Sequence, residues 1–109
     1  MRTVIGNAFS INMLKGDAVL RFTEINLETV IFLIQPDNDP IYSIIGHQGT
    51  ADLLTAKLGR EIKFNRENYK KEKEDRIIVC LPTSRLEEGK VLSREELDKT
   101  LVKFWLITE

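Results

Sequence analysis

Short apolar runs, separated by polar or glycine-containing turns, dominate the hydrophobic pattern of this chain. Continuous apolar runs of this length are typical of covered strands, and alternation of apolar and polar residues is typical of half-buried strands. The pattern predicts strands at residues 3–5, 18–25, 30–34, 41–45, 77–81 and 102–107. The residues assigned to the hydrophobic core alone are Leu33, Ile34, Ile78 and Leu81.

Helices are predicted mainly from their start signals. Thr50 is a suitable N-cap for a helix over residues 51–58, whose apolar side chains share one face and which a glycine follows. Ser93 and Glu96 have the spacing of a capping box, which predicts a helix from residue 94 to about residue 101. Residues 9–14, just beyond the first strand, predict a turn or a short helix.

These elements predict a single α/β domain of the α+β type over residues 1–109, with a mixed sheet of about five strands and two or three helices. The chain carries 16 Lys and Arg against 17 Asp and Glu, for a formal net charge of -1. Duplex DNA is therefore not expected as a partner, whereas a small anionic ligand needs only a few well-placed cations and amides. Residues 60–76 alternate in charge sign and predict a solvated connection.

Cys80 is the single cysteine, and it lies within an apolar run. An internal disulfide and a Cys/His zinc site are therefore excluded, and a buried strand cysteine is expected rather than a nucleophile. No metal ligand set and no cofactor are predicted. The chain opens on no signal-like stretch, and no apolar run approaches the roughly 18 residues that a membrane span needs, so a soluble cytoplasmic protein is expected.

His47 is the single histidine, and it lies where a strand-like run passes through glycines into a predicted helix. Its imidazole titrates in the range where it can act as a general acid. Arg85 and Glu88 follow a later strand and could complete a site that cleaves phosphodiesters. Taken alone, however, His47 also fits a residue whose ring is satisfied at a helix entrance, and Arg85 with Glu88 fits an ordinary surface pair.

Four motifs change the balance between these alternatives. They are Asn-Ala-Phe-Ser-Ile-Asn-Met-Leu at residues 7–14, Ile-Gly-His at 45–47, Asn-Arg at 65–66 and Ser-Arg-Leu-Glu-Glu-Gly-Lys at 84–90. In order and spacing, along nearly the whole chain, they resemble the motifs of the viral anti-CRISPR ring nucleases, a family also found in bacteria and prophages. The chain departs from that pattern at Gln48 and Gly49, where the viral relatives commonly have Asp and Ser, and in the loop before Arg85.

The resemblance implies a homodimer that binds cyclic tetra-adenylate and cuts it, without a metal, to linear di-adenylate. This would switch off the effector nucleases of type III CRISPR defence. By resemblance the catalytic residues are His47, Arg85 and Glu88, and the ligand-binding residues are Asn7, Ser10, Gly46, Arg66 and Ser84.

The chemistry of RNA is compatible with this assignment, because the 2′-hydroxyl supplies the nucleophile and the protein need only align it with the leaving 5′-oxygen. His47 would then protonate the leaving oxygen, Arg85 would stabilise the phosphate charge, and Glu88 would orient one of the two. No general base is evident. Two identical subunits match the two-fold symmetry of a cyclic tetranucleotide.

Other functions fit the same sequence. A protein that sequesters the cyclic nucleotide without cutting it is the main alternative. A small interaction or DNA-binding protein of a virus or mobile element is a third. At the chain's end, Phe104 and Trp105 lie on opposite faces of the predicted strand, so that one is expected in the core and the other at an interface, with base stacking as a lesser possibility.

Overall fold

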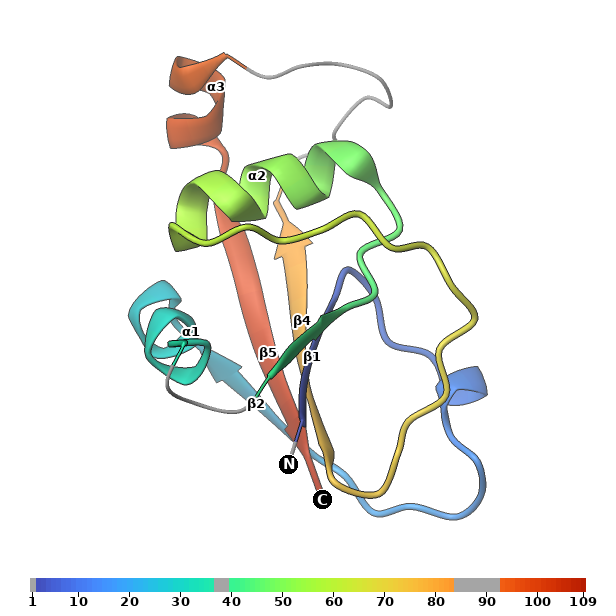
Figure 1. Ribbon diagram of the computed structural model, residues 1–109. Helices are drawn as coiled ribbons and strands as arrows, with labels where there is room; N and C mark the ends of the chain where they lie inside the picture. Colours follow the sequence, from blue (N-terminus) through green and yellow to red (C-terminus); the bar gives the residue numbers. More distant parts are fainter. Residues whose placement is uncertain (1, 37–39, 84–92) are drawn as a thin grey trace.

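The computed structural model describes residues 2–36, 40–83 and 93–109, and within them a single mixed sheet of five strands. The spatial order is β2-β5-β4-β1-β3 (Figure 1). The strands are β1 (Arg2–Gly6), β2 (Arg21–Ile25), β3 (Ile41–Ser43), β4 (Asp75–Pro82) and β5 (Val102–Thr108). Strands β3, β1 and β4 run parallel, and β5 is antiparallel to both β4 and β2. The predicted α+β fold is confirmed.

Three α-helices and one short 3-10 helix accompany the sheet in the described part of the chain. They are η1 (Ile11–Met13), α1 (Leu27–Leu33), α2 (Gln48–Leu58) and α3 (Arg94–Lys99). The capping box before α3 is confirmed, since the Ser93 hydroxyl accepts from the Glu96 amide and the Glu96 carboxylate accepts from the Ser93 amide, both at 3.2 Å. Helix α2 ends at Gly59, whose left-handed φ of 67° suits a glycine.

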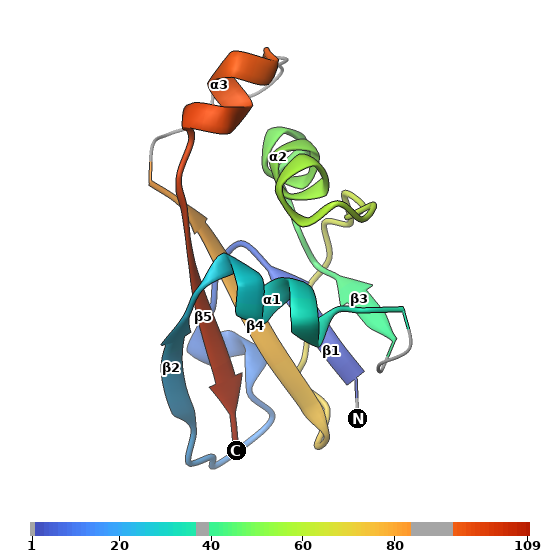
Figure 2. The same ribbon diagram turned by 90° about the vertical axis from the view of Figure 1, so that its left-hand side faces the viewer.

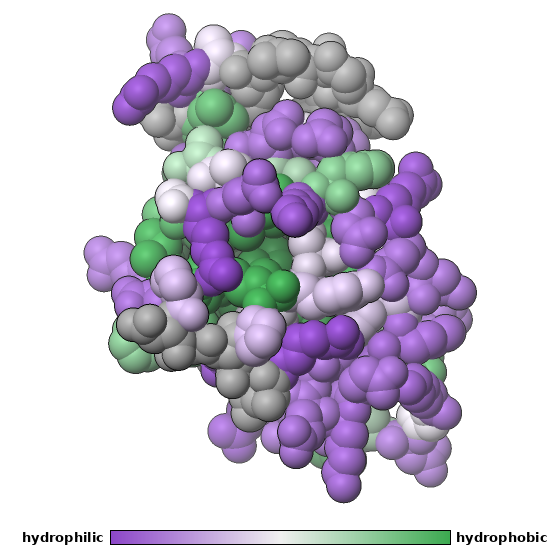
Figure 3. All heavy atoms as spheres, in the orientation of Figure 1, coloured by the Kyte–Doolittle hydropathy of each residue, from purple (hydrophilic) through white to green (hydrophobic). Residues whose placement is uncertain are grey.

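The two faces of the sheet are covered differently. Helices α1 and α2 pack on one face (Figures 1 and 2), where their residues Val30 and Leu54 meet Ile5, Ile78 and other sheet residues in the larger core cluster. On the opposite face Val4, Ile77 and Ile107 pack against Tyr69 and against residues of the segment that follows β1. In the space-filling view, apolar side chains gather at the centre, between α1 and α2 (Figure 3).

The strand predicted at residues 30–34 is wrong, because this apolar run belongs to helix α1 and the residue after it. A run of five apolar residues has the same appearance in a buried strand and in a buried turn of helix. The local signal that decides is Asn26, whose side-chain oxygen accepts from the Thr29 amide at 2.8 Å as an N-cap. Val30 and Ile34, four residues apart, are buried, while Phe32 between them is 66% exposed.

The core prediction holds for Ile34 and Ile78, which are buried, and Leu33 packs against the core while partly exposed. It is wrong for Leu81, which is 38% exposed near the end of β4. Cys80 is buried as predicted, and burial raises the pKa of its thiol to about 12, which keeps it protonated.

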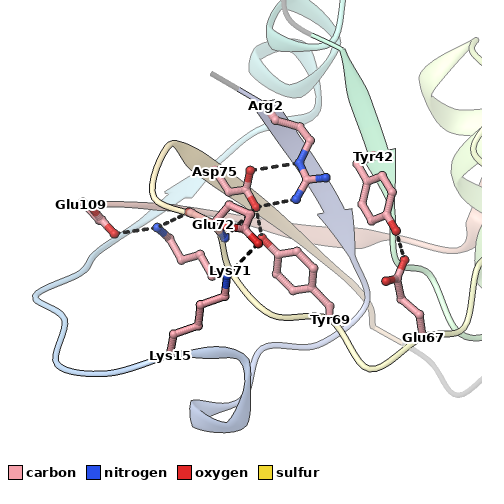
Figure 4. A network of polar contacts seen from close by, with 9 residues as sticks. All are labelled: Arg2, Lys15, Tyr42, Glu67, Tyr69, Lys71, Glu72, Asp75 and Glu109. Atoms are coloured by element: carbon pink, nitrogen blue, oxygen red, sulfur yellow. Dashed lines mark hydrogen bonds and ion pairs between the residues drawn. The ribbon is translucent and has the colours of Figure 1, made fainter.

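The solvated connection predicted at residues 60–76 is wrong in part, because Ile62, Tyr69, Lys71 and Asp75 are buried. Asp75, the first residue of β4, accepts two hydrogen bonds from the Arg2 guanidinium, at 3.0 and 2.8 Å, and one from the Tyr69 hydroxyl (Figure 4). Alternating charge therefore does not mark a wholly solvated segment here. Tyr69 and Asp75 hold the later part of the connection against Arg2 of β1.

Candidate functional site

The predicted site residues follow strands that end at one edge of the sheet. Because β1, β3 and β4 are parallel, their carboxyl ends meet at this edge. Asn7 comes directly after β1, and Gly46 and His47 connect β3 to α2, which crosses above the edge (Figure 1). Parallel α/β sheets commonly bind ligands at such an edge.

His47 is the N-cap of α2. Its backbone is extended, with φ of -138°, and its Nδ1 accepts a hydrogen bond from the Thr50 amide at 3.2 Å. The N-cap predicted at Thr50 is therefore wrong, and Thr50 instead lies inside the first turn with only 5% of its surface exposed. Ser, Thr, Asp and Asn are the residues favoured as N-caps, and the one nearest to the predicted helix is Thr50. The imidazole of His47 accepts the same kind of hydrogen bond but is not among the favoured residues.

The capping bond fixes which nitrogen of the ring carries the hydrogen. A neutral imidazole has one donor and one acceptor nitrogen, and Nδ1 is the acceptor here, so the hydrogen lies on Nε2. No hydrogen bond joins Nε2 to any residue in the described part of the chain, and the side chain is only partly buried. Nε2 is the nitrogen left for a ligand.

Asn7 and Arg66 both lie against the turn that precedes His47. The side-chain oxygen of Asn7 accepts from the Gly46 amide at 3.1 Å, which links the end of β1 to this turn. A methyl group on Gly46 would lie 3.4 Å from Cγ of Arg66. The arginine stem therefore lies directly beside the glycine, within contact distance of any side chain placed there.

Backbone contacts explain why Arg66 is held so close. Residues 64 and 45 form a parallel bridge, and the Asn65 amide donates to the Ile45 carbonyl at 2.9 Å. The Asn65 side chain also donates to the Ser43 carbonyl at 2.8 Å. Sequence reasoning missed this bracing role of Asn65, although the Asn-Arg motif contained the signal. The second and third motifs, far apart along the chain, are neighbours in space.

Ser10, predicted by resemblance to bind the ligand, caps a short helix. Its hydroxyl accepts from the Asn12 amide at 3.1 Å and caps η1, and the residue is exposed three positions after Asn7. Ser84, Arg85 and Glu88 lie outside the described residues, so their predicted roles stay predictions. Strand β4, which leads into that segment, ends at the same edge of the sheet as β1.

Among the described residues, no group of three or more His, Cys, Asp or Glu side chains could hold a metal ion. The helices in that same part of the chain include none that is both long and apolar enough to cross a bilayer.

The fold and this edge define a small α+β domain in which a histidine caps the helix above the ends of the parallel strands. The chain belongs to the STIV B116-like family, whose model matches residues 3–106.

Its relatives include viral proteins. The uncharacterized protein ORF116 of Acidianus filamentous virus 1 is 34% identical over 100 residues, which are 91% of this chain and 84% of that protein. The uncharacterized protein 26 of Sulfolobus islandicus filamentous virus is 33% identical over 89 residues, or 81% of this chain and 74% of that protein. The structure of B116 from Sulfolobus turreted icosahedral virus superimposes with a TM-score of 0.80 at 27% identity, and covers 100% of both chains.

Proposed function

We propose that this protein is a metal-independent ring nuclease that binds cyclic tetra-adenylate and cleaves it to linear di-adenylate with 2′,3′-cyclic phosphate ends. By destroying this messenger it would switch off the effector nucleases of type III CRISPR defence and act as an anti-CRISPR protein. The observation that carries the proposal is the position of His47, whose ring caps α2 through Nδ1 and keeps Nε2 available at the edge where three parallel strands end.

The surroundings of His47 suit an anionic ligand. The start of an eleven-residue helix presents backbone amides and the positive end of the helix dipole. Arg66 adds a cation beside Gly46. A cyclic oligonucleotide presents phosphodiesters that such a site can bind, without the broad basic surface that duplex DNA requires.

The proposed reaction needs one proton transfer that His47 can make. The ribose 2′-hydroxyl loses its hydrogen to solvent and its oxygen forms a bond to phosphorus, the bond from phosphorus to the 5′-oxygen breaks, and protonated His47 gives the hydrogen on Nε2 to that leaving oxygen. A positioned general acid contributes roughly 10² to 10⁴ in rate. Arg85, outside the described residues, would stabilise the phosphate charge, and Glu88, also outside them, would orient Arg85 or His47.

The homodimer in this proposal would use an apolar hollow beside the site. The hollow has a volume of about 530 Å³ and lies on the face of the sheet opposite α1 and α2. It includes Ala8 and Phe9, which lie between Asn7 and Ser10 in the first motif, so a subunit packed there would be next to the site. The remaining lining residues are Phe22, Val79, Leu81, Trp105 and Ile107.

Charged side chains of opposite sign flank this hollow. Glu24 lies opposite Trp105 in the β2–β5 ladder, and Lys103 lies two residues from Trp105 along β5, so all three share one face of the sheet. Both charged residues are exposed, and no ion pair joins either to a described residue. Across a two-fold axis near Trp105, Glu24 of each subunit would face Lys103 of the other. Phe104, on the other face, is buried, so it is the one of the two aromatic residues that belongs to the core.

The direct test is to incubate the purified protein with cyclic tetra-adenylate in the presence of a chelator and to resolve the products by mass. Linear di-adenylate with 2′,3′-cyclic phosphate ends is the expected product. Recovery of the intact ring bound to the protein would contradict cleavage and identify a sponge. If the ring neither bound nor changed, the proposed function would be wrong, and an interaction or DNA-binding role would replace it.

A further inference from the structure

Thr50 contributes a buried hydroxyl whose only partner in the described part of the chain is the ring of His47. The residue is 5% exposed, and its Oγ1 lies 3.3 Å from His47 Nδ1. That separation is long for a hydroxyl hydrogen bond. The same Nδ1 already accepts a hydrogen bond from the Thr50 amide at 3.2 Å, so the hydroxyl is not its main partner. One residue thus directs two different polar groups at the same ring nitrogen.

These two groups serve different protonation states of the ring. A backbone amide can only donate, so it suits the neutral ring, in which Nδ1 is an acceptor. When the ring is protonated, Nδ1 also carries a hydrogen, and the amide no longer offers it a partner. A hydroxyl can rotate and accept, and a hydrogen bond to a charged donor is shorter and stronger than a neutral one.

We propose that Thr50 is a positioning residue whose hydroxyl accepts from Nδ1 of protonated His47, so that the ring keeps one orientation, with Nε2 outward, in both protonation states. The consequence for cleavage rests on the proposed function. There, Nε2 of the protonated ring gives its hydrogen to the leaving 5′-oxygen, and the neutral ring that results keeps its remaining hydrogen on Nδ1, bonded to the Thr50 hydroxyl. Thr50 itself touches neither ligand nor reacting atoms.

No other side chain that the structure describes near the ring offers this contact. Arg66 lies against Gly46 and is a cation, which cannot accept. Asp52, further along α2, accepts from the Gln48 side-chain amide at 2.9 Å and has no hydrogen bond or ion pair with His47. Asn7 uses its side-chain oxygen on the Gly46 amide. Arg85 and Glu88 lie outside the described residues.

The test uses Thr50→Val, which has nearly the same shape and keeps the backbone amide but lacks the hydroxyl, with Thr50→Ser as the control that restores it. Because His47 is the single histidine, imidazole ¹⁵N and ¹³C signals report on this ring alone. At any one pH where both forms of the ring are present, the ratio of protonated to neutral ring should fall about three-fold or more in Thr50→Val and return in Thr50→Ser, while the neutral ring keeps its hydrogen on Nε2 in all three proteins. A protonated fraction in Thr50→Val equal to that of the wild type would overturn the inference.

Cleavage measured on the same proteins separates this inference from the proposed function. Single-turnover cleavage of cyclic tetra-adenylate should slow by about ten-fold in Thr50→Val at neutral pH, with ligand affinity unchanged, and recover in Thr50→Ser. If the wild-type protein does not cleave the ring, the proposed function fails, but the spectra still decide the role of Thr50. Equal cleavage rates in the wild type and Thr50→Val would contradict the catalytic consequence.

Discussion

The side-chain oxygen of Asn7 accepts a hydrogen bond from the Gly46 amide at 3.1 Å, and so joins the end of β1 to the turn that carries His47. The two residues are 39 positions apart along the chain. This bond holds the histidine backbone in place relative to the sheet, because Gly46 immediately precedes the residue that caps α2.

Replacing Asn7 should separate its structural role from its ligand role. Asn7→Ala removes the acceptor, and we expect a loss of about 1–2 kcal/mol in the free energy of unfolding, measured by urea denaturation. Asn7→Asp keeps an acceptor, so its stability should stay close to that of the wild type, while its added negative charge weakens the binding of cyclic tetra-adenylate. An Asn7→Asp variant that binds the ring as tightly as wild type would remove Asn7 from the ligand pocket.

Gly46→Ala should leave the fold intact and impair the site. The new methyl group would meet Cγ of Arg66 at 3.4 Å, and a flexible side chain can move by the few tenths of an ångström required. We expect less than about 1 kcal/mol of destabilisation, together with weaker ring binding because Arg66 is displaced. Calorimetry of unfolding and titration with the ring measure the two effects. A large loss of stability with unchanged binding would show that Gly46 is a packing residue only.

The Asp75 carboxylate makes stability depend on acid. Burial raises the pKa of Asp75, but hydrogen bonds from Arg2, Tyr69 and the Glu72 amide lower it by more, so the pKa lies below its ordinary value (Figure 4). Because this pKa is lowered, the charged Asp75 carboxylate stabilises the folded protein fully above the ordinary carboxyl pKa of about 4. This contribution to stability is lost as the pH falls through the lowered pKa.

Asp75→Asn is the matched variant for this effect. At pH 7 it should unfold with about 2 kcal/mol less free energy than the wild type, since hydrogen bonds to a charged group are lost. The difference between the two proteins should shrink as the pH falls below about 4, because the stabilisation of the wild type by charged Asp75 is then progressively lost. A stability difference that stays constant down to pH 2 would contradict this account of the network.

Self-association is tested on the apolar hollow and the charges that flank it. Leu81→Glu puts a charge on its exposed apolar rim and should shift sedimentation toward the monomer. Lys103→Glu should also weaken association, because it would place two negative charges opposite each other between the subunits. Adding Glu24→Lys should restore association, because the double variant exchanges the two charges and keeps an opposite-charge pair. If the double variant stays as dissociated as Lys103→Glu alone, Glu24 and Lys103 do not pair across the interface.

Much of the fold was predictable from the sequence because its signals are local. The apolar runs of β4 and β5 and the Ser93 capping box identify themselves within a few residues. Helix α1 was not predicted, since five apolar residues have no distinguishing period and the Asn26 cap was overlooked. Tyr69 donates to Asp75, which the distant Arg2 also contacts, and Lys71 pairs with the distant Glu109. Charge patterning cannot reveal these long-range partners.

The contacts among four residues that the motifs include could not be predicted from the sequence. The motifs named Asn7, Gly46, His47 and Arg66, and these residues do meet at one edge. The capping role of His47 was hidden because the general rule favours hydroxyl and carboxamide caps, which led to Thr50. Residues where a local rule fails are often functional, and here the failure reveals how the ring is held.

Single-turnover cleavage of cyclic tetra-adenylate by His47→Asn, compared with the wild type under chelation, tests the central claim most directly. Asparagine is among the best N-caps, so this variant should keep helix α2 and the stability of the protein, whereas His47→Ala should lose about 1 kcal/mol. With the proton donor removed from a folded protein that still binds the ring, we predict that cleavage slows by about 10² or more. Cleavage by His47→Asn at the wild-type rate would contradict the assignment of His47 as the general acid.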